Sequence, residues 1–335
     1  MKTRRLLFVF LLFLPSQLFA QDLRQVESTA QLAGGSIAFI TIIDSQENVA
    51  RAGAASDTAI ATMQQLAVEI RGIVPRLESA PVGEPIHLSP TAFDFFRTAL
   101  DLSAMTNGWY DVTAPSARSW FTKRDWRRVE LDASTQTITL KSDGMKFGVD
   151  LLLAGAQVDR AMDVLASHGI TNARVTVGPV TRSVGNDLFT PWRFQLGLPY
   201  EGNTQYAQRA LTYDLTTAGA VAVMTAKEVE IIIDPKFKKA LTPKFSTMAV
   251  LANNATTAIA FAVTVAPFAP PIALDIIKTH PEVKGIIIDP SRKIFASTEL
   301  SEITRPSPII EPPNLSRGDR GPNDLQQKRR EEESD

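Results

Sequence analysis

Short runs of β-branched residues are interspersed with helical patterns between residues 36 and 288, and this mixture most limits the folds open to the chain. Ser36–Asp44 reads SIAFITIID, which is typical of a β-strand. Thr58–Arg76 instead has the spacing of a helix, with an apolar face formed by Ile60, Met63, Leu66, Ile70 and Ile73. Pro75 predicts that this helix ends by Val74. Because strands and helices do not alternate strictly, the sequence predicts an α+β fold of mixed β-sheets with packed helices.

The same mixed pattern continues along the chain. Ser89 followed by Pro90 predicts the start of a second helix, and Val158–His168 predicts a third helix that Gly169 stops. Residues 128–132 and 137–141 predict a hairpin, and Met248–Val265 predicts a strand followed by a helix from near Asn254. The remaining expected elements are strands at Ala173–Val177, Trp192–Leu198, Leu211–Leu215, Glu228–Ile233 and Gly285–Ile288, and a helix at Leu274–His280.

Two segments of the chain resemble each other. Ile231–Lys236 reads IIIDPK, and Ile286–Lys293 reads IIIDPSRK. In each, an aspartate before proline turns the chain out of a buried strand, so Asp234 and Asp289 are expected to cap their own turns. The alternative is a fold of two related β-α-β halves, with the two carboxylates facing each other.

The first 20 residues have the pattern of an export signal. A basic start with Lys2, Arg4 and Arg5 is followed by the apolar run Leu6–Leu14 and a short polar region that ends at Ala20. This run is too short to cross a bilayer of about 30 Å, so we interpret residues 1–20 as a cleavable signal peptide. The sequence has no cysteine that a lipid anchor would need, so a periplasmic or secreted protein without a membrane anchor is expected.

Composition excludes several function classes. With 35 basic and 36 acidic residues, the net charge is -1, and no basic field for nucleic-acid binding is expected. Zero cysteines exclude disulfide scaffolds, cysteine nucleophiles and thiolate metal sites. Only three histidines, His87, His168 and His280, are available for imidazole chemistry.

The chain divides into three parts by composition. After the signal peptide, residues 21–302 form the folded part, and residues 303–335 form a tail. The tail is rich in proline and ends in QQKRREEESD, a composition that cannot bury apolar surface, so disorder is expected there. Its mixed charges make it a candidate segment for binding a protein partner.

Several motifs in the folded part occur in the order of a known family. Val149–Gly185 and the PWRFQLGLP that follows, together with Leu102–Pro115 (LSAMTNGWYDVTAP), resemble the ApbE-type flavin transferases, which are FAD:protein FMN transferases. Leu211–Gly219, Glu230–Pro235, Val250–Val265 and the final KGIIIDPSRKIFAS resemble four later segments of that family. The resemblance extends from about residue 36 to residue 300 and implies the flavin transferase fold, with its two related halves.

The resemblance also implies which residues would contact FAD. Residues at matching positions are Tyr110, Asp111, Thr113, Asp150, Gly155, Asp159, Gly178, Gly219 and Asp234. Trp109 and Tyr110 match the aromatic position that lies near the flavin in the family. Family members transfer FMN from FAD to a threonine or serine of a target protein, with Mg²⁺ stabilising the phosphoryl charge.

Other positions depart from the family pattern at its catalytic residues. The family's histidine before Ile-Ile-Asp-Pro corresponds to Ile231. The aspartate and threonine that help to hold Mg²⁺ correspond to Ile259 and Val263, which carry no oxygen ligand. These departures predict that Mg²⁺ binding and catalysis have been lost, which leaves a flavin-nucleotide or partner-binding role.

Two alternatives stay open from the sequence. The first is an active FAD:protein FMN transferase whose Mg²⁺ site is rebuilt from Asn253, Asn254, Thr256 or Thr257. The second is a periplasmic scaffold that binds no flavin and meets its partner through the tail.

Overall fold

The β-branched runs of the sequence assemble into one eight-stranded antiparallel sheet. In β2 (Ile37–Ser45), Ala38, Ile40 and Ile42 are almost fully buried on one face, as the alternation of a strand requires. The structure is a computed structural model. It describes residues 22–116, 125–188, 190–197, 210–215, 219–229, 232–234, 236–297 and 305–306.

The large sheet is built from two halves with the same plan. Its strands, in spatial order, are β1 (Leu23–Gln31), β2, β6 (Ala173–Val177), β7 (Val180–Val184), β11 (Gly219–Thr225), β12 (Thr247–Ala252), β13 (Lys284–Ile288) and β14 (Ile294–Ala296). Each half supplies four neighbouring strands, and helices lie in the chain between its second and third strands. This arrangement confirms the predicted α+β fold, including its two related β-α-β halves.

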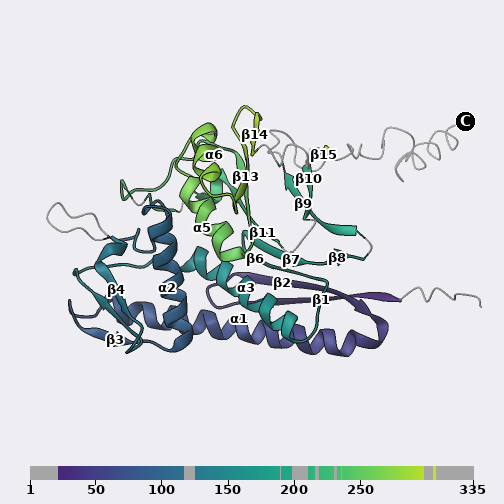
Figure 1. Cartoon of the computed structure of the whole chain (residues 1–335), viewed down its shortest axis with the longest axis horizontal. Coiled ribbons are helices and arrows are strands. Elements are labelled where there is room, and N and C mark those ends of the chain that lie inside the picture. Colours follow the sequence, from purple (N-terminus) through teal and green to yellow (C-terminus); the bar gives the residue numbers. More distant parts are fainter. Residues whose placement is uncertain are drawn as a thin grey trace, which may run out of the picture.

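Helices cover one face of the large sheet (Figure 1). Those that contact the face are α1 (Val49–Glu78), α3 (Asp150–Ser167), α5 (Ala255–Val265) and α6 (Pro270–Lys278). The described helices also include α2 (Pro90–Met105), which packs against α1, and the single turn α4 (Ala226–Val229) at the end of β11, with 3₁₀ turns at Gln46–Asn48 and Trp126–Arg128. The helices α1, α3 and α5 pack side by side, and their apolar faces join the inner face of the sheet in one core. Within the described residues, no helix has both the length and the apolar character that crossing a membrane requires.

Two smaller sheets complete the fold. A three-stranded sheet beside α2 contains β3 (Pro85–His87), β5 (Thr137–Leu140) and β4 (Val129–Asp132), which confirms the predicted hairpin. A four-stranded sheet contains β15 (Arg305–Pro306), β10 (Ala210–Leu215), β9 (Thr190–Gly197) and β8 (Asn186–Asp187). Trp192 and Leu196 of β9 pack on the face of the large sheet away from the helices, against Val221, Ala249, Ile286 and Ile288.

The structure corrects the predicted boundaries of three helices. The first helix continues through Pro75 to Glu78, because a proline near the end of a helix costs only one backbone hydrogen bond. That helix also begins nine residues before Thr58, at Val49, in an alanine-rich stretch with little apolar periodicity. The third helix begins at Asp150 rather than Val158, and α6 begins at Pro270 rather than Leu274. Prolines at the first helical positions need no hydrogen-bond partner, which explains the start of α6.

The predicted strand Glu228–Ile233 is wrong. Glu228 and Val229 belong to the short helix α4, and Ile233 makes only an isolated bridge with Ala240. The Glu228 carboxylate accepts hydrogen bonds from the backbone N–H and the hydroxyl of Thr225, and this local cap favours a helical turn where β11 ends. Ile232 and Ile233 therefore lie outside any named strand, although isoleucine is typical of strands, and residues 230 and 231 lie outside the described residues.

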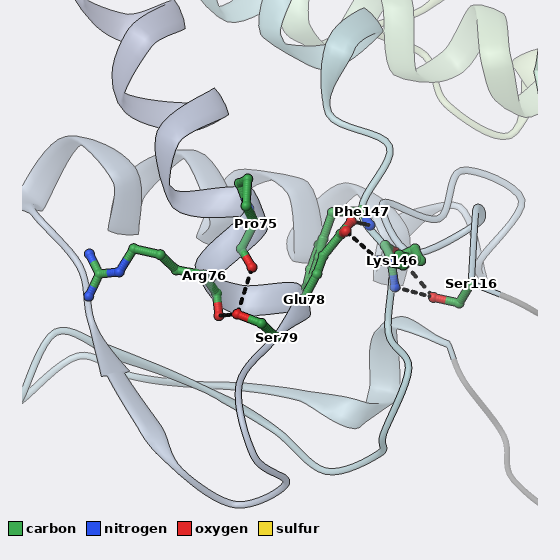
Figure 2. Close-up of polar contacts among 7 residues, drawn as sticks. All are labelled: Pro75, Arg76, Glu78, Ser79, Ser116, Lys146 and Phe147. Carbon is green, nitrogen blue, oxygen red and sulfur yellow. Dashed lines mark hydrogen bonds and ion pairs between the residues drawn. The ribbon is translucent and has the colours of Figure 1, made fainter.

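Polar contacts at the end of α1 fix the segments that lead into the site described below (Figure 2). The Glu78 carboxylate accepts from the Phe147 backbone N–H at 3.0 Å and pairs with Lys146 Nζ at 2.7 Å. The Ser116 hydroxyl accepts from the Lys146 backbone N–H at 2.8 Å and donates to the Lys146 carbonyl. The end of α1 thereby anchors the segment around Lys146, and through Lys146 it also anchors the turn that ends at Ser116.

Residues 1–20 and most of the tail lie outside the described residues. The signal peptide and the disordered tail therefore stay predictions. The described part of the tail, Arg305–Pro306, pairs with Leu211 and Thr212 of β10.

Candidate functional site

The chain leaves α2 through a tightly fixed segment that carries three of the predicted site residues. The Asp111 carboxylate accepts from both the backbone N–H and the hydroxyl of Thr113, at 2.8 and 2.7 Å. Asp111 and Thr113 are buried, and so is Tyr110, whose hydroxyl has no hydrogen-bond partner among the described residues. Burial, with a smaller contribution from the Asp111 charge, raises the pKa of Tyr110 far above its usual range, so this phenol is neutral.

A second loop, Asp234–Leu241, meets this segment through two lysines. Lys236 Nζ donates to the Asn107 carbonyl at 2.9 Å, and Lys238 Nζ donates to the Ala114 carbonyl at 3.2 Å. The Asp234 carboxylate shapes this loop by accepting the backbone N–H groups of Lys236 and Phe237. The structure therefore brings four predicted residues, Tyr110, Asp111, Thr113 and Asp234, to adjoining loops.

Asp111 and Lys238 are partly buried groups, and the charge of each affects the pKa of the other. Burial raises the pKa of the Asp111 carboxyl, while the hydrogen bonds from Thr113 and the positive charge of Lys238 oppose this rise. Burial lowers the pKa of Lys238, and the charge of Asp111 opposes that fall. The Asp111 carboxyl and the Lys238 ammonium therefore lose their charges more easily here than they would in water.

Aromatic rings border the same loops. Trp109 packs edge-on against Phe268, with ring centroids 4.5 Å apart, and Lys236 Nζ lies 5.1 Å from the Trp109 ring centroid. Phe268 follows α5 directly, so the cluster lies at the C-terminal end of that helix. We call Trp109, Lys236 and Phe268 the aromatic–lysine cluster. Half-buried rings beside a cation suit a flat ligand with negative charge.

Gly108 is needed where the two loops meet. Its φ of +71° is a left-handed conformation that favours glycine. A Cβ atom at this position would lie 2.9 Å from Trp126 Nε1 and 3.6 Å from Lys236 Nζ. A side chain there would displace the Trp126 indole, whereas its contact with Lys236 Nζ would be an ordinary one.

Two other predicted residues meet at the opposite end of α5. The Asp159 carboxylate accepts the backbone N–H groups of Ala255 and Thr256, at 2.8 and 2.9 Å, and pairs with Arg182 at 2.9 Å. Gly155 lies one turn earlier on α3, and a Cβ there would lie only 2.8 Å from Thr256 Cα. Gly155 permits the close approach of α3 and α5, and Asp159 caps α5 where the helix dipole favours negative charge.

Two buried aliphatic residues lie between these groups. Ile259 is fully buried and Val263 is 8% exposed, one turn apart on α5, and both belong to the main core. The 11 residues of α5 span about 16 Å, which separates Asp159 from the aromatic–lysine cluster. Ile231, the third position singled out with them, lies outside the described residues.

Three predicted site residues lie apart from both groups. Asp150 pairs with Arg71 at 2.8 Å and is largely exposed, Gly178 forms the turn between β6 and β7 with a φ of +53°, and Gly219 begins β11 opposite Ser183. Asp289 accepts from the Lys293 backbone N–H and the Ser291 hydroxyl. Asp234 and Asp289 each cap their own turn, as predicted, but only Asp289 directly follows a strand.

The sequence patterns missed the residues that join these segments. Lys236, Lys238 and Phe268 connect the two loops and the end of α5, and Arg182 neutralises Asp159. The only available signal for the lysines was their position just after Asp234-Pro235. No local pattern marks Arg182, because it reaches Asp159 from a strand 23 positions later in the chain.

The sequence also matches a family model over residues 35–287, which is the model of the ApbE family. This chain belongs to the ApbE family. The match covers the large sheet from β2 to most of β13, and it includes the loops that carry Asp111 and Asp234. Among curated proteins, no sequence matches the chain significantly.

Solved ApbE structures share the fold of this chain. The ApbE protein of Thermotoga maritima superposes with a TM-score of 0.67 at 17% identity, over 84% of this chain and 100% of that one. The flavin transferase ApbE of Vibrio cholerae gives 0.67 at 18% identity, over 84% and 99%. The apo form of the Pseudomonas stutzeri flavinyl transferase ApbE gives 0.69 at 14% identity, over 84% and 97%. Because the identities are only 14–18%, these comparisons show a shared fold and nothing more.

Proposed function

We propose that this ApbE-family chain is an exported flavin-nucleotide-binding protein that has lost Mg²⁺-dependent FMN transfer. The observation that carries the proposal is the pair Ile259 and Val263, which stand where the family resemblance expects the aspartate and threonine that hold Mg²⁺. Both side chains are packed in the core and carry no oxygen atom. Since Mg²⁺ requires oxygen ligands in near-octahedral geometry, these residues do not fit the ion.

The oxygen-bearing side chains nearby do not fit Mg²⁺ either. The Asn254 side chain caps α5 by accepting from the Thr257 backbone N–H at 2.7 Å, and the Thr256 hydroxyl donates to Asp159 at 2.7 Å. These groups surround the N-terminus of a helix, where the dipole repels a cation. Within the described part of the chain, no group of three or more histidine, aspartate or glutamate side chains is suitably placed to hold a metal.

The aromatic–lysine cluster supports the flavin-binding part of the proposal. The rings of Trp109 and Phe268 would contact a flavin, and the ammonium groups of Lys236 and Lys238 would lie near its phosphates. A bound flavin supplies redox chemistry, whereas these residues of the chain only bind and orient it. The part of the proposal that concerns export is based on the signal-peptide pattern of residues 1–20.

One assay tests the catalytic part of the proposal. The mature chain is incubated with FAD, Mg²⁺ and a flavinylatable substrate domain, and covalent flavin is followed by fluorescence on a denaturing gel. The Vibrio cholerae flavin transferase serves as the positive control. We expect no labelling above that of a reaction without protein. Mg²⁺-dependent labelling by the wild-type chain would establish the active transferase instead.

A titration tests the binding part separately. Quenching of FAD fluorescence by the mature chain should give a saturable curve in the micromolar range, unchanged by removal of Mg²⁺. A chain that neither labels the substrate domain nor quenches FAD would be a scaffold, and the tail would then be the first segment to test for partner binding.

A further inference from the structure

A cavity of about 700 Å³ lies on the face of the large sheet that the helices do not cover. Its lining includes Phe39, Arg174, Thr176, Thr181, Arg193 and Phe194. β9 covers only part of this outer face, where Trp192 and Leu196 pack on β11, β12 and β13. The cavity lies between β9 and the uncovered strands β1, β2 and β6. Its volume is in the range of small-molecule sites, about 300–1,000 Å³.

Strand register explains why these side chains share one surface. Phe39 lies opposite Thr29 on one side and Thr176 on the other, and Thr176 lies opposite Thr181. In the next row, Thr41 lies between Glu27 and Arg174. Since side chains alternate along a strand, both rows point away from the inward-facing Ala38, Ile40 and Val175.

Arg174 is held in place on this surface. Its guanidinium lies 5.0 Å from the ring centroid of Trp192, and that indole is 1% exposed and donates to the Val184 carbonyl at 2.9 Å. A guanidinium stacked on a fixed ring loses little freedom when it binds, and its N–H groups match a carboxylate or sulfonate in a bidentate way. The neighbouring Thr176 and Thr181 hydroxyls, 2.9 Å apart, add polar partners.

The remaining walls are apolar. Phe39 is 49% exposed, which is unusual for so large an apolar side chain, and Phe194 of β9 lies across the cavity from it. The charged side chains Arg174, Arg193 and Glu27 also line the cavity, and the width of β2 separates Glu27 from Arg174. The cavity therefore combines an apolar wall with the fixed guanidinium of Arg174.

We propose that this cavity between β9 and the outer face of the large sheet binds a small organic anion with a flat apolar body, whose acidic group pairs with Arg174. The body of such a ligand would contact Phe39 and Phe194. The site is separated by the thickness of the sheet from the aromatic–lysine cluster, so it is independent of the proposed flavin site.

Matched dyes test this proposal. The mature chain is titrated with 8-anilinonaphthalene-1-sulfonate and, separately, with N-phenyl-1-naphthylamine, which has a similar ring system without the sulfonate. We expect one saturable sulfonate site, and Arg174→Met should weaken the affinity for the sulfonate dye at least tenfold while changing that for the neutral dye little. Arg97→Met, which removes an exposed arginine of α2 outside the cavity, is the control and should leave both affinities unchanged.

A second variant keeps the test decisive if Arg174→Met does not fold. Phe39→Glu changes a half-exposed residue and places a negative charge beside the site, so it should remove sulfonate binding while the circular dichroism spectrum stays native. An unchanged sulfonate affinity in the folded variants, an equal loss with Arg97→Met, or displacement of the dye by FAD would overturn the proposal.

Discussion

The carboxylate of Asp159 caps α5 through Thr256, whose backbone N–H and hydroxyl donate to it at 2.9 and 2.7 Å. This contact joins α3 of the first half of the fold to α5 of the second. Arg182 pairs with the same carboxylate and keeps its charge balanced in a site that is four-fifths buried. The family resemblance predicts a flavin contact at this position, and the structure shows a role at the junction of the halves.

Replacement of Asp159 by asparagine should destabilise the fold by about 2–3 kcal/mol. The amide keeps the shape of the side chain but loses the charge that the helix N-terminus and Arg182 require. Urea unfolding followed by circular dichroism measures the change. Asp163→Asn, at an exposed position one turn along α3, is the matched control and should stay within about 0.5 kcal/mol of wild type.

Gly155→Ala should destabilise the protein by about 1–3 kcal/mol, although alanine is the better helix former. The new methyl group would lie 2.8 Å from Thr256 Cα and 2.9 Å from the Ala255 carbonyl oxygen, so the two helices must move apart. Gly72→Ala on α1, where the new methyl meets no atom within 4 Å, should instead stabilise by up to about 1 kcal/mol. Equal effects of the two substitutions in thermal unfolding would contradict the close helix contact.

Ile259→Asp tests whether α5 retains a place for a divalent cation. A carboxylate at this fully buried position should cost about 4 kcal/mol or more, and millimolar Mg²⁺ should not restore the lost stability. Ile259→Val, the control, should cost about 1 kcal/mol. Recovery of the aspartate variant by Mg²⁺, measured as a rise in unfolding temperature, would mean that other oxygen ligands reach this point.

Stability should depend on pH through Asp111. Its pKa is raised by burial above the 3.8 of the unfolded chain, so the bound proton stabilises the folded state. That contribution is complete below pH 3.8 and is lost as the pH rises through the folded pKa. The difference in unfolding free energy between wild type and Asp111→Asn should therefore fall across this interval.

The charge of Lys238 limits this effect. Because the cation opposes the rise in the pKa of Asp111, Lys238→Met should raise that pKa further and extend the loss of stability to higher pH. Urea unfolding from about pH 3.5 to 7, repeated for each variant, measures both effects. Parallel pH profiles for wild type and Asp111→Asn would show that the carboxyl is not buried in solution.

Trp109→Ala should weaken FAD binding about tenfold, since stacking on an aromatic ring contributes about 1–3 kcal/mol. Fluorescence titration with FAD gives the affinity. Phe39→Ala removes an aromatic side chain from the opposite face of the sheet and should leave the FAD affinity unchanged. If both variants bind FAD as wild type does, the flavin contacts lie outside the aromatic–lysine cluster.

Local patterns predicted most elements but not all of their ends. Ser89 accepts from the Ala92 backbone N–H, and Asn254 accepts from that of Thr257, so both predicted helix starts are confirmed by capping contacts. The Ala-rich start of α1 has no apolar stripe that predicts a helix, and its conformation depends on the packing of its buried alanines, which no window of sequence contains. At Glu228 and Val229, the local hydrogen bonds with Thr225 favour a helical turn over the predicted strand.

The residues of the candidate site also divide into those that a sequence motif predicts and those that only packing brings together. The motif order located Asp111, Thr113 and Asp234, because each lies in a short segment with its own turn chemistry. Lys236, Lys238 and Phe268 carry no motif, and they became part of the site only through contacts with residues more than 100 positions away. Such contacts form only when the fold brings the segment after α2 next to the loop that carries Lys236 and Lys238.

The sequence by itself determined the α+β class and the membership in one family, because local patterns in a fixed order are sufficient for these. The two-half plan was an expectation that the family resemblance implied. Only the tertiary structure decided that Asp159 caps a helix of the other half, that Gly155 is a point of close packing, and that Arg174 lies stacked on a buried indole beside a cavity. Each of these is set by distances between segments far apart in the chain, and such distances follow from the packing of the whole core.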